Sequence, residues 1–121
     1  MVVKFLVDTN IAIYQLQNRL AERLPEGRYF LSIISEIELL AYPGLTTAEE
    51  KGIKTLLKAI EIVTLTDSVK QETIRIKRDN NLKLPDAIII ATARINGCVL
   101  LTNDQQLAKS RLIDTKAFRL R

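Results

Sequence analysis

Apolar residues occur along this chain in two kinds of pattern. Short continuous runs rich in Val, Ile, Leu and Phe are typical of strands buried on both faces of a parallel sheet. The first run is followed at once by an acid, Asp8, where the strand ends and a helical pattern begins. Strands are predicted at residues 2–7, 28–33, 61–65 and 98–102, with a short last strand within 112–118.

Helical spacing fills the segments between these strands. Apolar residues recur at helical intervals across 11–24, until Pro25 and Gly27 interrupt them. Strands that alternate with helices indicate an α/β domain, and 121 residues suffice for one domain, 1–121. The other helices are expected at 35–42, 47–60, 68–80, 84–94 and 105–109.

Several helices carry capping signals in the sequence. Ser35-x-x-Glu38 and Thr47-x-x-Glu50 fit the capping box, in which a hydroxyl and an acid satisfy free backbone N–H groups. Asp67 is the predicted N-cap of the helix at 68–80. Gly97 is the predicted C-cap of the helix at 84–94. Capping is also the ordinary structural explanation for Asp8 and for Glu38.

Composition narrows the possible chemistry. The chain has no His and no Trp, and its single Cys lies in an apolar run. Catalytic triads that contain His are therefore excluded, as is zinc bound by imidazole. A lone buried thiol suits a reducing compartment, and neither a signal peptide nor a membrane span is evident. We therefore expect a cytoplasmic protein without a membrane partner, in which carboxylates perform any catalysis.

The charge balance favours a polyanionic partner. The net charge is +4, from 18 Lys and Arg and 14 Asp and Glu. If four of the acids form one site, the remaining ten face 18 basic residues, so the surroundings of that site are positive. The candidate phosphate contacts are a group of basic residues on and after the helix at 68–80, namely Lys70, Arg75, Lys77, Arg78 and Lys83.

Four acids stand where an α/β sheet places its sites. Asp8 and Asp104 follow buried strands, Asp86 begins an apolar helix, and either Glu36 or Glu38 begins another. Clustered carboxylates repel one another unless a cation binds or their pKa values rise. Oxygen ligands without His or Cys favour Mg²⁺ or Mn²⁺, which suits phosphodiester hydrolysis.

These segments, in this order, resemble the PIN-domain family. The matching motifs are Val7-Asp8-Thr9-Asn10, Ser35-x-x-Glu38-Leu39, Asp86-Ala87-x-Ile89-x-Ala91-Thr92-Ala93 and Leu101-Thr102-Asn103-Asp104. The short chain is similar to the VapC-like toxins of toxin–antitoxin pairs. The resemblance implies a three-layer sandwich with a parallel sheet of about five strands, and metal-dependent endoribonuclease activity.

The resemblance also assigns roles to residues. It implies that the catalytic, metal-binding acids are Asp8, Glu38, Asp86 and Asp104, and that the supporting polar residues are Asn10, Ser35, Thr102 and Asn103. Many members have a further Asp followed by Phe after the last motif. Here Gln106-Leu107 stands in that place, which leaves Asp104 as the only acid of this motif.

The expected cofactor is Mg²⁺ or Mn²⁺, and the expected partners are RNA, a small cognate antitoxin and a second copy of the chain in a homodimer. We expect Tyr14, Leu39, Tyr42 and Leu45 to belong to the core rather than to an interface. The alternative function is a catalytically silent PIN-like module that binds RNA or protein. Retention of four mutually repelling acids argues for the enzyme.

Overall fold

The computed structural model covers residues 1–121 and contains one five-stranded sheet with the order β3-β2-β1-β4-β5. All neighbouring strands are parallel, which confirms the predicted α/β class. Every strand lies within its predicted range, although several are shorter. The strands are β1 (Lys4–Val7), β2 (Arg28–Ser32), β3 (Glu61–Val63), β4 (Val99–Leu101) and β5 (Thr115–Lys116).

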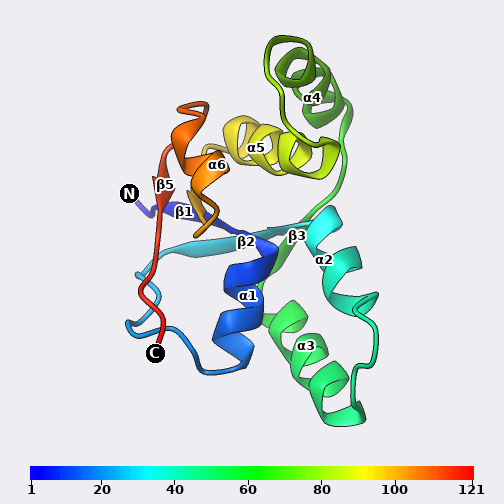
Figure 1. Ribbon diagram of the computed structural model, residues 1–121, viewed down its shortest axis with the longest axis vertical. Coiled ribbons are helices and arrows are strands. Elements are labelled where there is room, and N and C mark those ends of the chain that lie inside the picture. The colour runs from blue at the N-terminus through cyan, green and yellow to red at the C-terminus, as the bar shows by residue number, and fades with distance from the viewer.

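Helices cover both faces of this sheet and give the predicted three layers (Figure 1). The helices are α1 (Thr9–Leu16), α2 (Ile33–Leu40), α3 (Thr47–Ala59), α4 (Asp67–Asp79), α5 (Leu84–Asn96) and α6 (Gln105–Lys109). In Figure 1, α4 and α5 lie on one side of the sheet, and α1 and α3 lie on the other. None of these helices combines the length and the apolar character needed to cross a bilayer.

The alternation of side chains along β1 separates two hydrophobic cores. Leu6 points into the core beneath α4 and α5, where it joins Phe30 and Leu100. Phe5 and Val7 point into the core beneath α1, α2 and α3. A strand that buries both faces needs a continuous apolar run, which explains why the opening of the sequence predicted β1 so clearly.

The chain reverses its direction across the sheet next to β1. From β1 it proceeds to β2 and β3 on one side, and it then crosses to β4 and β5 on the other. The loops that follow β1 and β4 therefore diverge and leave a crevice at the carboxyl edge of the sheet, where open α/β folds bind ligands. Asp8 follows β1 and Asp104 follows β4, so this topology brings the two acids to the crevice.

Three predicted N-caps are wrong by one to three residues. The N-cap of α2 is Ser32, whose hydroxyl accepts a hydrogen bond from the Ile34 N–H, so Ser35 lies inside the helix. Thr46 and Glu49 form the capping box of α3, in place of Thr47 and Glu50. Thr66, and not Asp67, caps α4. In each case a hydroxyl residue before the predicted one already satisfies the free N–H groups, whereas Gly97 is confirmed as the C-cap of α5.

The first helix ends earlier than the leucine spacing predicted. It stops at Leu16, and Asn18 adopts the left-handed conformation with φ 56°, which Asn tolerates better than most residues. The following residues pair with the end of the chain instead, because Leu20 forms an antiparallel bridge with Leu120. Leu20 is buried as its pattern suggested, but it is held by this long-range bridge rather than by a helix.

The expectation that four apolar residues near the first two helices belong to the core is right for three of them. Leu39 is buried, and Tyr14 and Leu45 are partly buried against the same cluster. Tyr42 is 59% exposed, because α2 ends before it and the turn at Pro43 carries it to the surface.

Candidate active site

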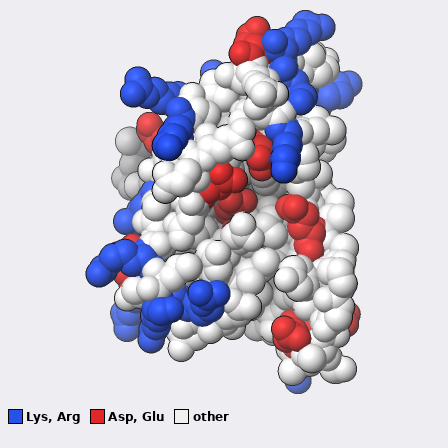
Figure 2. All heavy atoms as spheres, viewed as in Figure 1, with Lys and Arg blue, Asp and Glu red and all other residues white.

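A cleft of about 360 Å³ opens at the carboxyl edge of the sheet and is lined by all four predicted acids, Asp8, Glu38, Asp86 and Asp104. Each acid comes from a different element: Asp8 and Asp104 cap α1 and α6, and Asp86 lies in the first turn of α5. Glu38 does not begin its helix as expected but lies in the last turn of α2, which starts at Ile33. Figure 2 shows acidic side chains gathered in a central hollow of this face, with Lys and Arg side chains above it and along the left of the view and further acids at the lower right. The structure therefore brings together the four acids that the motifs singled out.

Asp8 is fixed by two hydrogen bonds at the end of β1. Its Oδ1 accepts from the Thr9 N–H at 2.8 Å, which makes Asp8 the N-cap of α1. Its Oδ2 accepts from Thr102 Oγ1 at 2.7 Å, and this hydroxyl belongs to the residue that follows β4. Asp8 is thus both a helix cap and a member of the acidic cleft. The structural and the functional interpretations of this residue are compatible.

Glu38 is held by the Thr9 hydroxyl, which also contacts the Ser35 hydroxyl. Thr9 Oγ1 lies 2.8 Å from Glu38 Oε1 and 2.8 Å from Ser35 Oγ, within hydrogen-bonding distance of both. A hydroxyl has one proton, so Thr9 can donate to the carboxylate while it accepts from Ser35, which is fully buried. Glu38, and not Glu36, therefore lines the cleft.

The other two acids have different supports. Asp104 Oδ1 caps α6 by accepting from Gln106 N at 2.8 Å and from Leu107 N at 3.4 Å, and the Asp104 N–H donates to Thr102 Oγ1 at 3.0 Å. Thr102 therefore links Asp8 to Asp104. Asp86 lies in the first turn of α5, after Pro85.

The acids interact unfavourably with one another. Burial raises the pKa of Asp8, and the charges of Asp86 and Asp104 raise it further, against the opposing hydrogen bonds from Thr102 and Thr9. Burial and the charges of Asp104 and Glu38 likewise raise the pKa of Asp86, while Lys83 opposes this shift. Mutual repulsion in a partly buried cleft is the condition that a bound cation relieves.

The donor set fits a hard divalent cation, although the carboxylates are not preassembled around one point. The side chains include no group of three His, Cys, Asp or Glu arranged to hold a metal ion. Mg²⁺ needs few protein ligands, because it is usually bound through one or two carboxylates and completes its shell with water and phosphate oxygens. An open cleft lined by oxygen ligands suits that mode of binding better than a closed cage would.

The supporting residues named from the sequence divide into two groups. Thr102 donates directly to Asp8, whereas Ser35 is linked to Glu38 through the Thr9 hydroxyl. The Asn103 side chain instead bonds the backbone of Phe118: its Nδ2 donates to the Phe118 carbonyl at 2.9 Å, and its Oδ1 accepts from the Phe118 N–H at 2.7 Å. Asn103 therefore holds the C-terminal segment beside the loop that follows β4. Asn10 is exposed and lines the cleft without a side-chain hydrogen bond.

The basic group lies mostly away from the cleft. On α4, Lys70 pairs with Asp67, Arg75 with Glu72, and Lys77 donates to the Leu82 carbonyl. Arg78 is exposed on the same helix. Of the five predicted phosphate contacts, Lys83 is the one whose charge acts on an acid of the cleft, since it lowers the pKa of Asp86.

Sequence reasoning missed two residues of the cleft. Thr9 was part of a motif but had no role, and its contacts to Ser35 and Glu38 span 26 and 29 positions, which no local pattern reveals. Its place directly after Asp8 was the only available signal. Tyr42, which was expected in the core, lines the cleft rim together with Pro43.

Comparison with solved structures finds the same fold in several toxin–antitoxin complexes. A chain of a toxin–antitoxin complex from Klebsiella pneumoniae matches with a TM-score of 0.73 and 23% identity, over 88% of this chain and 91% of that one. A chain of VapBC2 from Rickettsia felis bound to promoter DNA matches with a TM-score of 0.78 and 13% identity, covering 96% and 99%. A chain of DNA-bound VapBC from Salmonella typhimurium matches with a TM-score of 0.75 and 20% identity, over 95% of this chain and 98% of that one.

Sequence comparison gives the family. No curated protein matches the chain. The family model for the PIN domain matches residues 5–111, which include all four acids of the cleft, β1 from Phe5 onward, β2, β3 and β4. The chain therefore belongs to the PIN domain family.

Proposed function

We propose that this protein is a metal-dependent endoribonuclease that hydrolyses RNA phosphodiester bonds in the cytoplasm. The observation that carries the proposal is the convergence of four carboxylates on one cleft, two of them with raised pKa values. A module that only binds RNA or protein would gain nothing from carboxylates that repel one another. The Lys and Arg side chains above and to the left of the cleft in Figure 2 support a polyanionic substrate.

The residues present would hold Mg²⁺ or Mn²⁺ through Asp8, Asp86, Asp104 and Glu38, with water completing the shell. When bound, such an ion supplies an activated water and neutralises charge on the phosphoryl oxygens. The chain itself orients the ligands: Thr102 fixes Asp8, Thr9 fixes Glu38, and the α6 N–H groups fix Asp104. Net hydrolysis joins a water oxygen to phosphorus and breaks one P–O ester bond.

We also propose that the protein is the toxin of a toxin–antitoxin pair and forms a homodimer. The solved structures with its fold include complexes described as toxin–antitoxin complexes, and they span nearly the same length. An apolar groove of about 310 Å³ between α1, α2 and α3 supports a protein partner. Ile13 and Tyr42 line both this groove and the cleft, so a partner seated there would border the active site. Exposed apolar side chains on α2, such as Ile37, are consistent with a dimer.

The test compares two glutamates of one helix. Glu38→Gln removes a charge from the cleft and is expected to reduce RNA cleavage by about 100-fold or more, whereas Glu36→Gln leaves it within about 2-fold of wild type. Growth arrest on expression in a bacterial host should follow the same order. Equal cleavage by the two variants would contradict the site, and cleavage without growth arrest would contradict the toxin role alone.

A further inference from the structure

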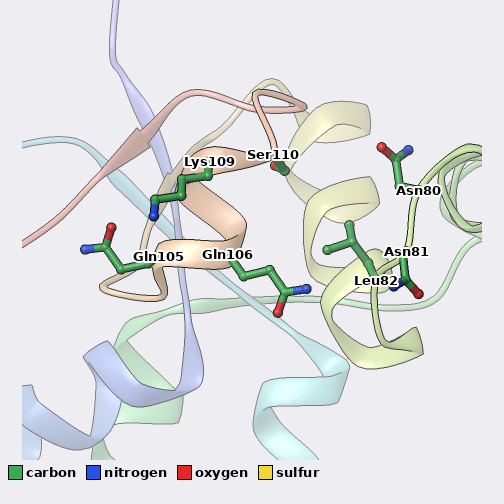
Figure 3. A pocket seen from close by; sticks show the side chains of 7 residues that line it. All are labelled: Asn80, Asn81, Leu82, Gln105, Gln106, Lys109 and Ser110. Atoms are coloured by element: carbon green, nitrogen blue, oxygen red, sulfur yellow. The ribbon is translucent and has the colours of Figure 1, made fainter.

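A second cavity, of about 480 Å³, lies between α6 and the connection from α4 to α5 (Figure 3). It takes no part in the function proposed above. Leu82 is the one hydrophobic residue of its lining and forms part of its buried base. The other lining residues carry amide, hydroxyl or ammonium groups, so the cavity, which we call the amide groove, suits a polar ligand.

The backbone connects both walls of the amide groove to acids of the cleft. Asn81 stands on one wall, five positions before Asp86. Gln106 stands on the other, and its N–H donates to Asp104 Oδ1 at 2.8 Å. Since Gln106 contacts Asp104, the candidate occupant of the groove is the nucleotide next to a phosphate held by these acids.

Three amide side chains of the groove form no hydrogen bond, and one of them, Gln105, points away from the wall of Asn81 in Figure 3. Asn80 and Ser110 already bond the backbone carbonyls of Ile76 and Leu107, so they act structurally. The side chains of Asn81 and Gln106 are exposed and form no hydrogen bond within the chain. In Figure 3, Gln106 extends from α6 toward the wall that carries Asn81 and Leu82. Lys109, also exposed and without an ion pair, adds positive charge to the lining.

The chemistry of these groups matches an unpaired nucleobase. An amide presents a donor beside an acceptor, which complements the N6 amino group and N7 of adenine. Proteins read RNA sequence mainly on unpaired bases, by hydrogen bonds to their edges. The groove has no aromatic side chain, so it lacks the stacking that binds every base alike.

We propose that the amide groove binds the base next to the cleaved phosphodiester and selects adenine there. Asn81 and Gln106 read the base edge, and Lys109 contacts an adjacent phosphate. The inference rests on the proposed nuclease function, and it adds the residues that determine sequence preference.

The experiment uses a randomised single-stranded RNA pool cleaved with Mn²⁺, followed by sequencing of the product ends. Wild type is expected to prefer adenine at one position beside the cut. The double variant Asn81→Ala/Gln106→Ala should lose about 10-fold of that preference, while the preferences at other positions remain. Gln71→Ala, an exposed amide on α4 outside the groove, is the matched control and should retain the wild-type profile.

If the double variant keeps the wild-type base preference, the inference is overturned and the nuclease function stands. The same holds if wild type selects a base other than adenine. If wild type cuts no RNA, the proposed function fails, and the pool is then tested for binding. Enrichment of adenine by wild type but not by the double variant supports the groove, and equal enrichment overturns it.

Discussion

At the scale of single residues, Asp8 is both a helix cap and one of the four acids of the cleft. It caps α1 and accepts from Thr102 across the reversal point of the sheet, yet its charge is disfavoured by burial and by two neighbouring acids. The sequence showed its position, because an apolar run that ends in an acid is a local signal. It could not show Thr9 as the partner of Glu38, since that contact exists only after the sheet has formed.

The raised pKa of Asp8 predicts that Asp8→Asn stabilises the metal-free fold at neutral pH. The native state holds the proton of Asp8 more tightly than the unfolded state, whose value is near 3.8. The free energy of unfolding of wild type therefore loses this contribution as pH rises from below 3.8 through the raised native pKa. The variant has no such titration.

Urea unfolding of both proteins in EDTA, from pH 3.5 to 7, measures this. The free-energy advantage of Asp8→Asn should grow with pH. An advantage that stays constant, or that shrinks as pH rises, contradicts the assigned direction of the pKa shift.

At the scale of elements, local signals gave each helix and strand but not its boundaries. The hydroxyls at Ser32, Thr46 and Thr66 cap their helices, whereas the capping motifs in the sequence predicted N-caps one to three residues later. Strand ends depend on where the ladder with the neighbouring strand stops, which is a tertiary fact. The pairing of Leu20 with Leu120, which replaced the expected end of the first helix, joins opposite ends of the chain and could not be predicted locally.

The packing of α4 on α5 depends on one buried acid that the sequence did not single out. Glu72 is 5% exposed, pairs with Arg75 on its own helix and with Arg94 Nε on α5 at 3.0 Å. Hydrogen bonds to a buried charged group contribute more than those between exposed ions. The ion pair between Glu72 and Arg94 therefore holds α5, the helix that carries Asp86, against α4.

Glu72→Gln should reduce the free energy of unfolding by about 1–3 kcal/mol. The matched control is Glu50→Gln on α3, whose ion pair with Lys54 is exposed and should contribute less than about 0.5 kcal/mol. Chemical denaturation of the two variants beside wild type compares them. Similar losses in both would show that the buried pair has no special role.

At the scale of the whole molecule, the fold separates charge by position. Four acids line the crevice beside β1, while Lys and Arg side chains lie above it and along the left of the view in Figure 2. The sequence predicted this arrangement from its net charge and from acids at strand ends, because parallel strands share one carboxyl edge. It could not predict which basic residue approaches the cleft, since that depends on how α4 and α5 pack.

Lys83 should contribute to RNA binding through a phosphate contact. In the cleavage-deficient Asp8→Asn background, Lys83→Ala is expected to weaken binding of single-stranded RNA and to reduce the slope of log affinity against log salt by about one. Lys58→Ala, on α3 beneath the opposite face of the sheet, is the control and should leave the slope unchanged. An equal change in both variants would contradict a local contact.

The most direct test of the central claim is cleavage of a mixed RNA pool by wild type and Asp8→Asn, with Mg²⁺ or Mn²⁺ and with EDTA. The structure predicts cleavage by wild type with the ion, loss of cleavage in EDTA with recovery when the ion is restored, and none by the variant at any concentration of either ion. Cleavage that persists in EDTA, or an Asp8→Asn protein as active as wild type, would contradict the assignment of these four acids as a metal-dependent active site.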